Sequence, residues 1–392
     1  MKIKNILAIV LCSIMLTGCW DKVEIDKKSF VSTVGVDTSK DISRVDEIKK
    51  VDSNDPFPER RLKILNVTFG YPNISKLGPG KEGSAEEKTI VTEAYSVEDG
   101  ISRAISKSSR NIHLGHMKLL ILSNEIMMYP EIVKEVVDYF QRQPLINRMM
   151  LVVIAEGKAE DYVKFKPEME ENIETYILGL MENCTRNASI FPVTLNEMLI
   201  SLSENGNAIV PRIKLDKEKN EVKLSGTAVI ENYKIKGVLN QVETSDLELI
   251  RGKLKGGKKV IIKNGHPIDY MIEGVERKVR VKKINDDKLL FTIDIKLEGR
   301  MKEYAIDKNV FSKKTLAEIE NNIDNSLSQE CEKIAKMTQQ KFGIDLFGLN
   351  EYIKKFKPKL WKEIKDDWKE IFSSSYIKIN INAKIRRIGI TK

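Results

Sequence analysis

Two stretches near the C-terminus alternate apolar and polar residues with a period of two. Phe291 to Leu297 and Ile377 to Ile385 place an apolar residue at every second position, with Thr, Asp, Lys or Asn between them. In a strand, a period of two puts all the apolar side chains on one face, and sheets with one covered face are commonly antiparallel. The sequence therefore predicts an antiparallel sheet near the C-terminus with one face exposed to water.

Two segments between these strands have the period of an α-helix. Apolar residues recur at spacings of three and four from Leu316 to Thr338, and again from Trp361 to Ile371. Both Trp361 and Trp368 belong to the second apolar stripe, so we interpret them as core residues and not as a ligand-binding cage. A sheet covered by a long helix and a Trp-containing helix predicts an α+β domain over residues 271–392.

The N-terminal part alternates short strands with helices. Strand patterns occur at 30–36, 62–69, 89–95, 118–122 and 149–155. The first helical pattern begins near Ser96, where Ser96 and Asp99 have the spacing of a helix cap. Further helical patterns occur at 130–140, from Ala159, at 169–181 and at 195–202, and Thr194 with Glu197 forms a capping box for the last of them. The order strand, helix, strand from 118 to 155 predicts two neighbouring parallel strands. We therefore expect a mixed α/β domain over residues 19–204.

The turn residues Asn205-Gly206-Asn207 predict the first domain boundary. Beyond them the pattern is mainly β, at 208–213, 222–230, 234–239 and 259–263, with a short helix at 246–250 capped by Ser245 and Glu248. We expect a small β-rich middle domain at 205–270 that is built on hairpins. The predicted fold is thus a three-domain protein of mixed α/β and α+β class.

The first twenty residues have the anatomy of a bacterial lipoprotein signal. Lys2 and Lys4 precede an apolar run from Ile6 to Leu16, which is shorter than the about 18 apolar residues of a membrane span. The segment closes on Leu16-Thr17-Gly18-Cys19, which matches the lipobox, where a cysteine receives a diacylglyceryl group before cleavage. We therefore predict a signal peptide at 1–18 and a lipidation site (S-diacylglyceryl and N-acyl) at Cys19, which tethers the mature chain to a membrane.

Composition limits the partners of this tethered body. The chain has 41% hydrophobic and 31% charged residues, as in ordinary globular proteins, and a formal net charge of +9. The densest basic run, Lys253 to Lys263, is interpreted as a solvated loop, with a contact to lipid headgroups as the alternative. Nucleic acid is not expected as a partner, because the run has no aromatic residues on which bases would stack. Cys184 and Cys331 are expected to be buried free thiols, although a bridge between them is left open.

No catalytic or metal-binding motif is found. His113 and His116 are three residues apart and could share a helix face, where a carboxylate such as Glu125 would complete a metal site. However, the sequence has no H-E-x-x-H, no C-x-x-C, no G-x-S-x-G and no phosphate-binding G-x-x-x-x-G-K pattern, so a structural role is favoured for both histidines. We expect no enzymatic activity, no cofactor and no bound metal, while the many carboxylates leave a hydrolase open.

Several blocks of the sequence resemble one family in order along the chain. The first is Cys19-Trp-Asp-Lys-Val-Glu-Ile25, and it is followed by blocks at 113–122, 149–159, 225–244 and 342–368 and by a final strand that ends at Gly389. The most specific block is Phe342-Gly-Ile-Asp-Leu-Phe-Gly348. Together these blocks resemble the Ger(x)C-type lipoproteins, the C subunits of spore germinant receptors. Leu145 and Asn350 depart from the pattern, where an acidic residue and a glycine would be usual.

The resemblance implies a function that the residues alone do not give. Members of the family are lipoproteins on the outer face of the spore inner membrane and C subunits of nutrient germinant receptors. The implied partners are two integral-membrane subunits, one A-type and one transporter-like B-type, and the implied signal is a small nutrient. Two alternatives stay open at this stage, a substrate-binding lipoprotein of an importer and a cell-envelope hydrolase. The sequence does not identify the germinant, the ligand-binding residues, the partner-binding surface or the oligomeric state.

Overall fold

The computed structural model describes residues 27–48, 50, 54, 62–73, 86–187, 190–263, 265–285, 288–301 and 312–388. The strands of this part of the chain are β1 (Lys28–Phe30), β2 (Thr33–Thr38), β3 (Leu65–Pro72), β4 (Glu87–Ala94), β5 (Asn111–His113), β6 (Leu119–Ser123), β7 (Leu151–Glu156), β8 (Asn207–Asp216), β9 (Glu221–Glu231), β10 (Lys234–Leu239), β11 (Gly257–Lys263), β12 (His266–Asn285), β13 (Lys288–Met301) and β14 (Tyr376–Ile388).

The helices of the same part are α2 (Val45–Ile48), α3 (Val97–Ser106), α4 (Pro130–Arg142), α5 (Ala159–Val163), α6 (Ile173–Asn187), α7 (Leu195–Asn205), α8 (Gln241–Arg251), α9 (Lys313–Met337), α10 (Leu349–Phe356), α11 (Pro358–Ile364) and α12 (Trp368–Ser374). Three short turns accompany them, the 3₁₀ turns η2 (Ile42–Arg44) and η4 (Ile126–Met128) and the π-helical turn η5 (Thr338–Phe342).

An eight-stranded mixed sheet forms the N-terminal unit, with the strand order β10-β9-β8-β7-β6-β2-β3-β4. The four central strands, β8, β7, β6 and β2, are parallel, and the flanking strands are antiparallel. The predicted parallel pair is confirmed, because β6 pairs with β7 from Leu119 and Leu151 onward. Helices α3, α4 and α7 pack on one face and α5 and α6 on the other, which explains why every residue of β6 is buried.

Local capping determines where two of these helices begin. Ser96 caps α3 by accepting a hydrogen bond from the Asp99 N–H at 3.2 Å. Thr194 caps α7 in a complete capping box with Glu197. Both caps are confirmed as predicted, because a side-chain oxygen at this position satisfies an N–H group that the first turn leaves unpaired.

The strands predicted for a separate middle domain at 205–270 are present, but they join the flanking sheets. β8, β9 and β10 extend the eight-stranded sheet, while β11 forms an edge of the C-terminal sheet. Gly206 ends α7 with a φ of 67°, and β8 then pairs parallel to β7. The Asn-Gly-Asn signal therefore marks the end of a helical crossover inside one sheet. We propose a division of the chain near residue 240 in place of the boundaries at 205 and 270.

Helix α8 begins earlier than predicted and has a different cap. The cap is Asn240, whose side chain accepts from the Glu243 N–H at 3.0 Å, while the Glu243 carboxylate accepts from the Asn240 N–H at 2.8 Å. The predicted cap, Ser245 with Glu248, lies inside the helix, where both residues are buried. Asn and Ser are similarly good caps, so the sequence offered two starts, and the structure uses the first.

The C-terminal sheet has the order β11-β12-β13-β14. The prediction of an antiparallel sheet is correct for the first three strands and wrong for the last, because β14 runs parallel to β13. Helices α9 to α12 carry the chain back to the start of β13 before β14 begins, and such a return produces a parallel pair. The apolar residues Ile319, Ile323 and Leu327 of α9 are buried in the same core as Phe291 and Ile293.

The predicted Trp-containing helix is divided into α11 and α12. Asp366 and Asp367 lie at the break, and aspartate is a poor helix former. Trp361 and Trp368 still meet, with ring centroids 5.8 Å apart, and both pack against the hydrophobic core of the C-terminal unit. Their interpretation as core residues is therefore confirmed.

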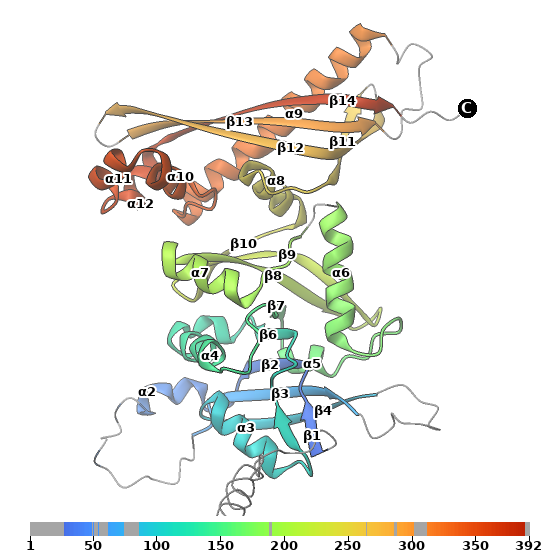
Figure 1. Cartoon of the computed structure of the whole chain (residues 1–392), viewed down its shortest axis with the longest axis vertical. Helices are drawn as coiled ribbons and strands as arrows, with labels where there is room; N and C mark the ends of the chain where they lie inside the picture. The colour runs from blue at the N-terminus through green and yellow to red at the C-terminus, as the bar shows by residue number, and fades with distance from the viewer. Residues whose placement is uncertain are drawn as a thin grey trace, which may run out of the picture.

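The N-terminal strands and the C-terminal sheet lie at opposite ends of the long axis, with α8 between the two sheets (Figure 1). Val229 and Leu239 of the large sheet belong to the hydrophobic core of the C-terminal unit, so the two units share one core at their junction. No helix in the described ranges is both long and apolar enough to cross a membrane.

Candidate functional site

Cys19, the predicted lipidation residue, lies outside the described residues, and the structure first describes the chain at Lys27. The other motifs of the sequence analysis can be placed. The fragment His113 to His116 is not helical, because His113 ends β5 and His116 lies in the turn that follows. Phe30 packs edge-on against both rings, with centroid distances of 5.5 and 4.7 Å. Burial, Lys28 and His116 together lower the pKa of His113.

The described residues contain no group of three or more His, Cys, Asp or Glu side chains that could hold a metal ion. Cys184 on α6 and Cys331 on α9 are free thiols. Cys331 is fully buried in the C-terminal core, and burial raises the pKa of its thiol. The expectation of a buried free thiol is confirmed for Cys331, whereas Cys184 is only partly buried against the core of the N-terminal unit.

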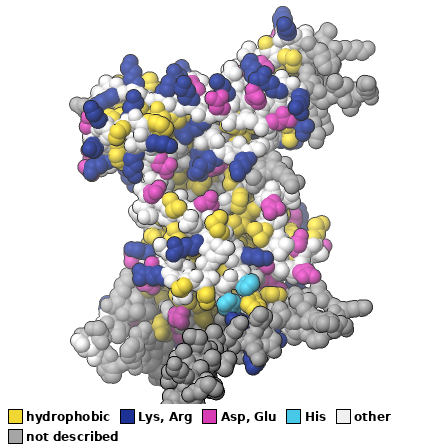
Figure 2. Space-filling view, viewed as in Figure 1, with side chains coloured by type: hydrophobic (Ala, Val, Ile, Leu, Met, Phe, Trp, Pro, Cys, Tyr) yellow, Lys and Arg dark blue, Asp and Glu magenta, His cyan; other side chains and the backbone are white. Residues whose placement is uncertain are grey.

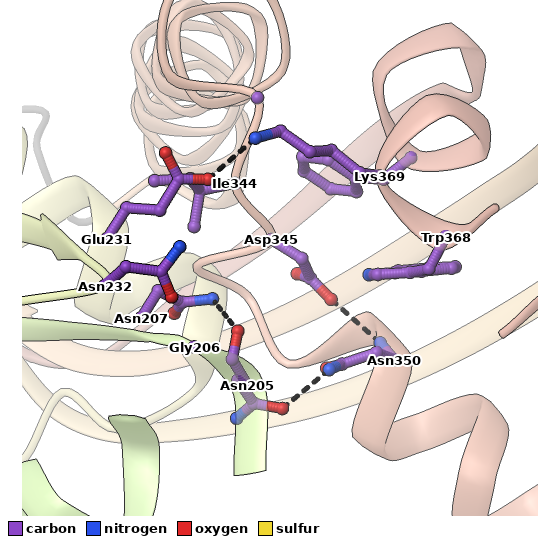
Figure 3. Close-up of a pocket in the computed structure, with 12 residues that line it drawn as sticks. Asn205, Gly206, Asn207, Glu231, Asn232, Ile344, Asp345, Asn350, Trp368 and Lys369 are labelled. Atoms are coloured by element: carbon purple, nitrogen blue, oxygen red, sulfur yellow. Dashed lines mark hydrogen bonds and ion pairs between the residues drawn. The ribbon is translucent and has the colours of Figure 1, made fainter. Parts of the chain in front are cut away.

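A pocket of about 140 Å³ opens where the eight-stranded sheet meets the C-terminal unit (Figure 3). The turn after α7 and the turn after β9 form one wall, and the loop 343–350 with α12 forms the other. Gly206, Asn232 and Gly343 line it with left-handed backbones, at φ values of 67°, 49° and 65°. Glycine and asparagine tolerate this conformation, which lets three tight turns converge on one small space.

Side chains from the two walls bond to each other around this pocket. Glu231 of β9 pairs with Lys369 of α12 at 2.7 Å and with Lys236 of β10 at 3.4 Å. Burial alone would raise the pKa of Glu231, but the bonds to these two lysines outweigh that effect and lower it. Asn205 accepts from the Asn350 side-chain amide at 2.7 Å and donates to the Glu351 carboxylate at 3.0 Å. Polar bonds therefore join the two units at this place.

Asp345 organises the loop on the C-terminal side. Its Oδ1 atom accepts from the Phe347 N–H at 3.0 Å, and its Oδ2 atom accepts from the Asn350 N–H at 2.8 Å. Desolvation raises the pKa of Asp345 to about 6, although these hydrogen bonds and the charge of Arg277 lower it in part. The block 342–348, the most specific part of the family resemblance, thus has a clear structural role, which is to hold the start of α10 against the other unit.

The lining of the pocket limits the chemistry that it supports. None of its twelve residues is Ser, Thr, Tyr, Cys or His, so the lining offers no hydroxyl, thiol or imidazole group. The lining does offer asparagine amides, one ion pair and the Trp368 ring (Figure 3). Such groups suit a few waters or one small polar molecule, because a water occupies about 30 Å³. The pocket is a polar joint between two units, and its two carboxylates are engaged, Glu231 in the ion pair with Lys369 and Asp345 in hydrogen bonds to backbone N–H groups.

A second feature that the sequence analysis missed is a pair of glutamates at the start of α6, where Glu174 of α6 is buried and Glu87 of β4 is half-buried. Glu174 accepts from the Ser32 hydroxyl at 3.3 Å, and Glu87 accepts from the Ile173 N–H at 3.2 Å. The Oε1 atom of Glu87 is buried and has no hydrogen-bond partner among the described residues. Burial, reinforced by the charge of Glu174, raises the pKa of Glu87 to about 7. No local sequence signal identifies this pair of glutamates.

A third missed feature lies within the basic run. Lys259 is buried and bonds to the buried Asp246 of α8, and its ammonium lies 3.8 Å from Glu330 of α9. Lys258 pairs with Asp269 at 3.2 Å. The interpretation of 253–263 as a solvated loop is therefore wrong for its second half, which is strand β11 with a buried ion pair.

Two protein-family models match the chain in succession. The spore germination protein N-terminal domain matches residues 21–215, and the spore germination B3/GerAC-like C-terminal domain matches residues 225–389. The two matches are separated only at the hairpin between β8 and β9. The chain belongs to the spore germinant-receptor C-subunit family. The family resemblance inferred from the sequence blocks is thereby confirmed.

Two proteins of Bacillus subtilis (strain 168) are similar to this germinant-receptor C-subunit family member over nearly their whole lengths. Spore germination protein YndF is 26% identical over 98% of this chain and 96% of its own. Spore germination protein B3 is 25% identical over 95% of this chain and 95% of its own. The crystal structure of the GerBC protein, which is 23% identical, matches with a TM-score of 0.60 over 82% of this chain and 93% of that chain. The mixed α/β and α+β fold class is confirmed by this match.

Proposed function

We propose that this protein is the lipid-anchored C subunit of a nutrient germinant receptor and has no enzymatic activity of its own. In this proposal Cys19 carries the lipid and holds the folded units at the outer face of the spore inner membrane. An A-type and a transporter-like B-type integral-membrane subunit are its partners there. The subunit acts by contact with them when a small nutrient is sensed.

The observation that carries the proposal is the position of the lipobox. Cys19 is at once the last residue of Leu16-Thr-Gly-Cys19 and the first residue of the motif with which the family begins. A diacylglyceryl group and an N-acyl group together give stable membrane anchoring, where a single chain gives marginal binding. Membership of the germinant-receptor C-subunit family supports the assembly with other receptor subunits. The engagement of both pocket carboxylates, Glu231 with Lys369 and Asp345 with backbone N–H groups, fits a structural role for this joint.

The anchor is tested by replacing Cys19 with alanine in the spore-forming host. Cys19→Ala is expected to abolish labelling with radioactive fatty acid and to move the protein into the soluble fraction. Cys12→Ala is the matched control, because Cys12 is removed with the signal and is expected to leave labelling unchanged. A Cys19→Ala protein that remains labelled and membrane-bound would contradict the proposal.

The receptor role is tested by deleting the gene and measuring germination with each nutrient. Loss of the response to one set of nutrients, restored by the wild-type gene, is the expected result. An unchanged response to every nutrient that the co-expressed membrane subunits handle would reject the role. Calorimetric titration of the purified protein with nutrients distinguishes a receptor subunit from the alternative, a substrate-binding lipoprotein of an importer. Such a lipoprotein would bind its nutrient tightly and with one-to-one stoichiometry.

A further inference from the structure

The position of Cys19 in the sequence determines which end of the molecule lies close to the membrane. Lys28, the first residue of β1, follows Cys19 by nine residues, and an extended chain of that length spans at most about 30 Å. β1 lies at the end of the long axis opposite the C-terminal sheet (Figure 1). Because it depends on a lipid at Cys19, this placement of the membrane rests on the proposed function.

Positive charge gathers on the segment that pairs with β1. No Asp or Glu occurs between Gly100 and Asn124, a segment that contains four Lys or Arg residues and two of the three histidines of the chain. Lys28 is in register with Asn111 of β5, directly after Arg110, and Lys107 follows the last turn of α3. We name Lys28, Lys107 and Arg110 the basic tip.

The three side chains of the basic tip form no ion pair with the described part of the protein. Arg103 of α3, by contrast, is paired with Asp99 at 2.7 Å. Lys107 is exposed and donates one hydrogen bond, at 2.8 Å, to the Val91 carbonyl. Positive charge at one end of a tethered body complements a surface of opposite sign.

Other cations of the molecule are placed differently. Figure 2 shows many Lys and Arg side chains over the C-terminal unit, with Asp and Glu among them. That unit lies at the far end of the long axis from β1 (Figure 1). Of the run 253–263, which the sequence offered as a lipid contact, Lys258 and Lys259 are held in ion pairs with Asp269 and Asp246.

We propose that the basic tip docks on the anionic lipid headgroups of the anchoring membrane and holds the body upright, with the C-terminal unit away from the bilayer. Each Lys or Arg close to an anionic surface raises the equilibrium constant for docking about fivefold, so three of them raise it roughly a hundredfold. This orientation leaves the C-terminal unit and the interdomain pocket at a distance from the headgroups. The attraction falls off within a Debye length, so the docked orientation is salt-dependent.

The test uses the full-length lipidated protein in vesicles and measures energy transfer to an acceptor dye on the lipid headgroups. A donor dye is attached at Ser109→Cys beside the tip or at Lys314→Cys at the start of α9, each in a Cys184→Ser background. The tip variant is Lys28→Gln with Lys107→Gln and Arg110→Gln. The matched control is Lys278→Gln with Lys282→Gln and Lys378→Gln, three exposed cations of the C-terminal sheet.

Strong transfer from residue 109 and weak transfer from residue 314 are expected on vesicles that contain phosphatidylglycerol. The signal from residue 109 should fall on pure phosphatidylcholine, in 1 M salt and in the tip variant, and remain in the control. Equal transfer from both ends, or transfer that ignores lipid charge, would overturn the docking. Stronger transfer from residue 314 would place the opposite end on the membrane and would overturn it as well.

Flotation of the same vesicles distinguishes a failure of the docking proposal from a failure of the proposed lipid anchor. Protein that floats with the vesicles but shows no preferred orientation overturns the docked tip and leaves the anchor intact. Wild-type protein that carries no lipid and does not float overturns the anchor itself, and the docking with it.

Discussion

Replacing Glu87 by glutamine is expected to stabilise the protein above neutral pH and to change its stability little near pH 5. Burial beneath α6 and the nearby charge of Glu174 raise the pKa of Glu87 to about 7, against 4.5 for an ordinary glutamate. A raised pKa means that the folded protein holds this proton more firmly than the unfolded chain does. The stability linked to Glu87 is therefore fully present below pH 4.5 and is lost as the pH rises through 7.

The size of the effect follows from the same two pKa values. At about 1.4 kcal/mol per pKa unit, the cost of ionising Glu87 in the folded protein approaches about 3 kcal/mol at high pH. Roughly 2.5 kcal/mol of this cost should appear between pH 5 and pH 8. Glutamine keeps the shape of the side chain and an oxygen that accepts from the Ile173 N–H, but it has no charge to lose.

Urea unfolding at pH 5, 6, 7 and 8, followed by circular dichroism, measures this difference. Circular dichroism is needed because Trp361 and Trp368 report on the C-terminal unit alone. Glu171→Gln is the matched control, since this glutamate is exposed just before α6, and its replacement should leave the pH dependence unchanged. If Glu87→Gln unfolds with the same pH dependence as the wild type, or is less stable at pH 8, the buried-carboxyl explanation is refuted.

Gly226→Ala should destabilise the protein by more than about 2 kcal/mol in urea unfolding, because φ is 117° and a Cβ atom would lie 2.0 Å from the Leu239 carbonyl oxygen. Its control, Gly179→Ala in α6, meets no atom within 4 Å and should stabilise by roughly 0.5–1 kcal/mol. Lys259→Met should cost the C-terminal unit about 3–5 kcal/mol in a tryptophan-fluorescence melt, since a buried aspartate loses its cation. Asn205→Ala removes two side-chain hydrogen bonds to α10 and should lower the free energy of unfolding by about 1–2 kcal/mol. An unchanged midpoint of urea unfolding would show that these bonds do not hold the two units together.

Much of the local structure was predictable because its causes are local. The Ser96 and Thr194 caps each depend on a partner three residues away, and both helices begin where these caps predict. The alternation at Phe291 to Leu297 determines which side chains enter the core, and Phe291, Ile293, Ile295 and Leu297 are all buried. A helix cap requires a partner three residues away, and burial of one face of a strand requires an apolar residue at every second position, so both can be recognised in the sequence.

Strand pairing was harder to predict because its causes are not local. The alternation of β14 is compatible with either direction, and only the path of α9 to α12 makes it parallel to β13. In the same way, the turn at Gly206 would look the same between two domains as it does between α7 and β8. A period of two records which face is buried and contains no information about the neighbouring strand.

The site features were missed for a related reason. Glu87, Asp246, Lys259 and Asp345 are charged residues, and the general expectation places such residues on the surface. Each is buried or desolvated because elements far apart in the sequence close over it, as α6 does over Glu87 and α9 does over Lys259. Neither the pocket nor the pair of glutamates has a sequence motif, because both depend on the placement of whole elements.

The two basic segments show how charge density along the chain differs from charge at the surface. The run 253–263 has more cations than the basic tip, yet Asp246 and Asp269 from neighbouring elements pair with two of them. Between residues 100 and 124 the cations are sparser, but no acid lies among them, and Lys28 of β1 adds to them in space. Anionic lipid is attracted by the Lys and Arg charges that are not already paired with Asp or Glu of the same protein. The end that lies beside the tether is therefore better suited to meet anionic lipid than the densest basic run.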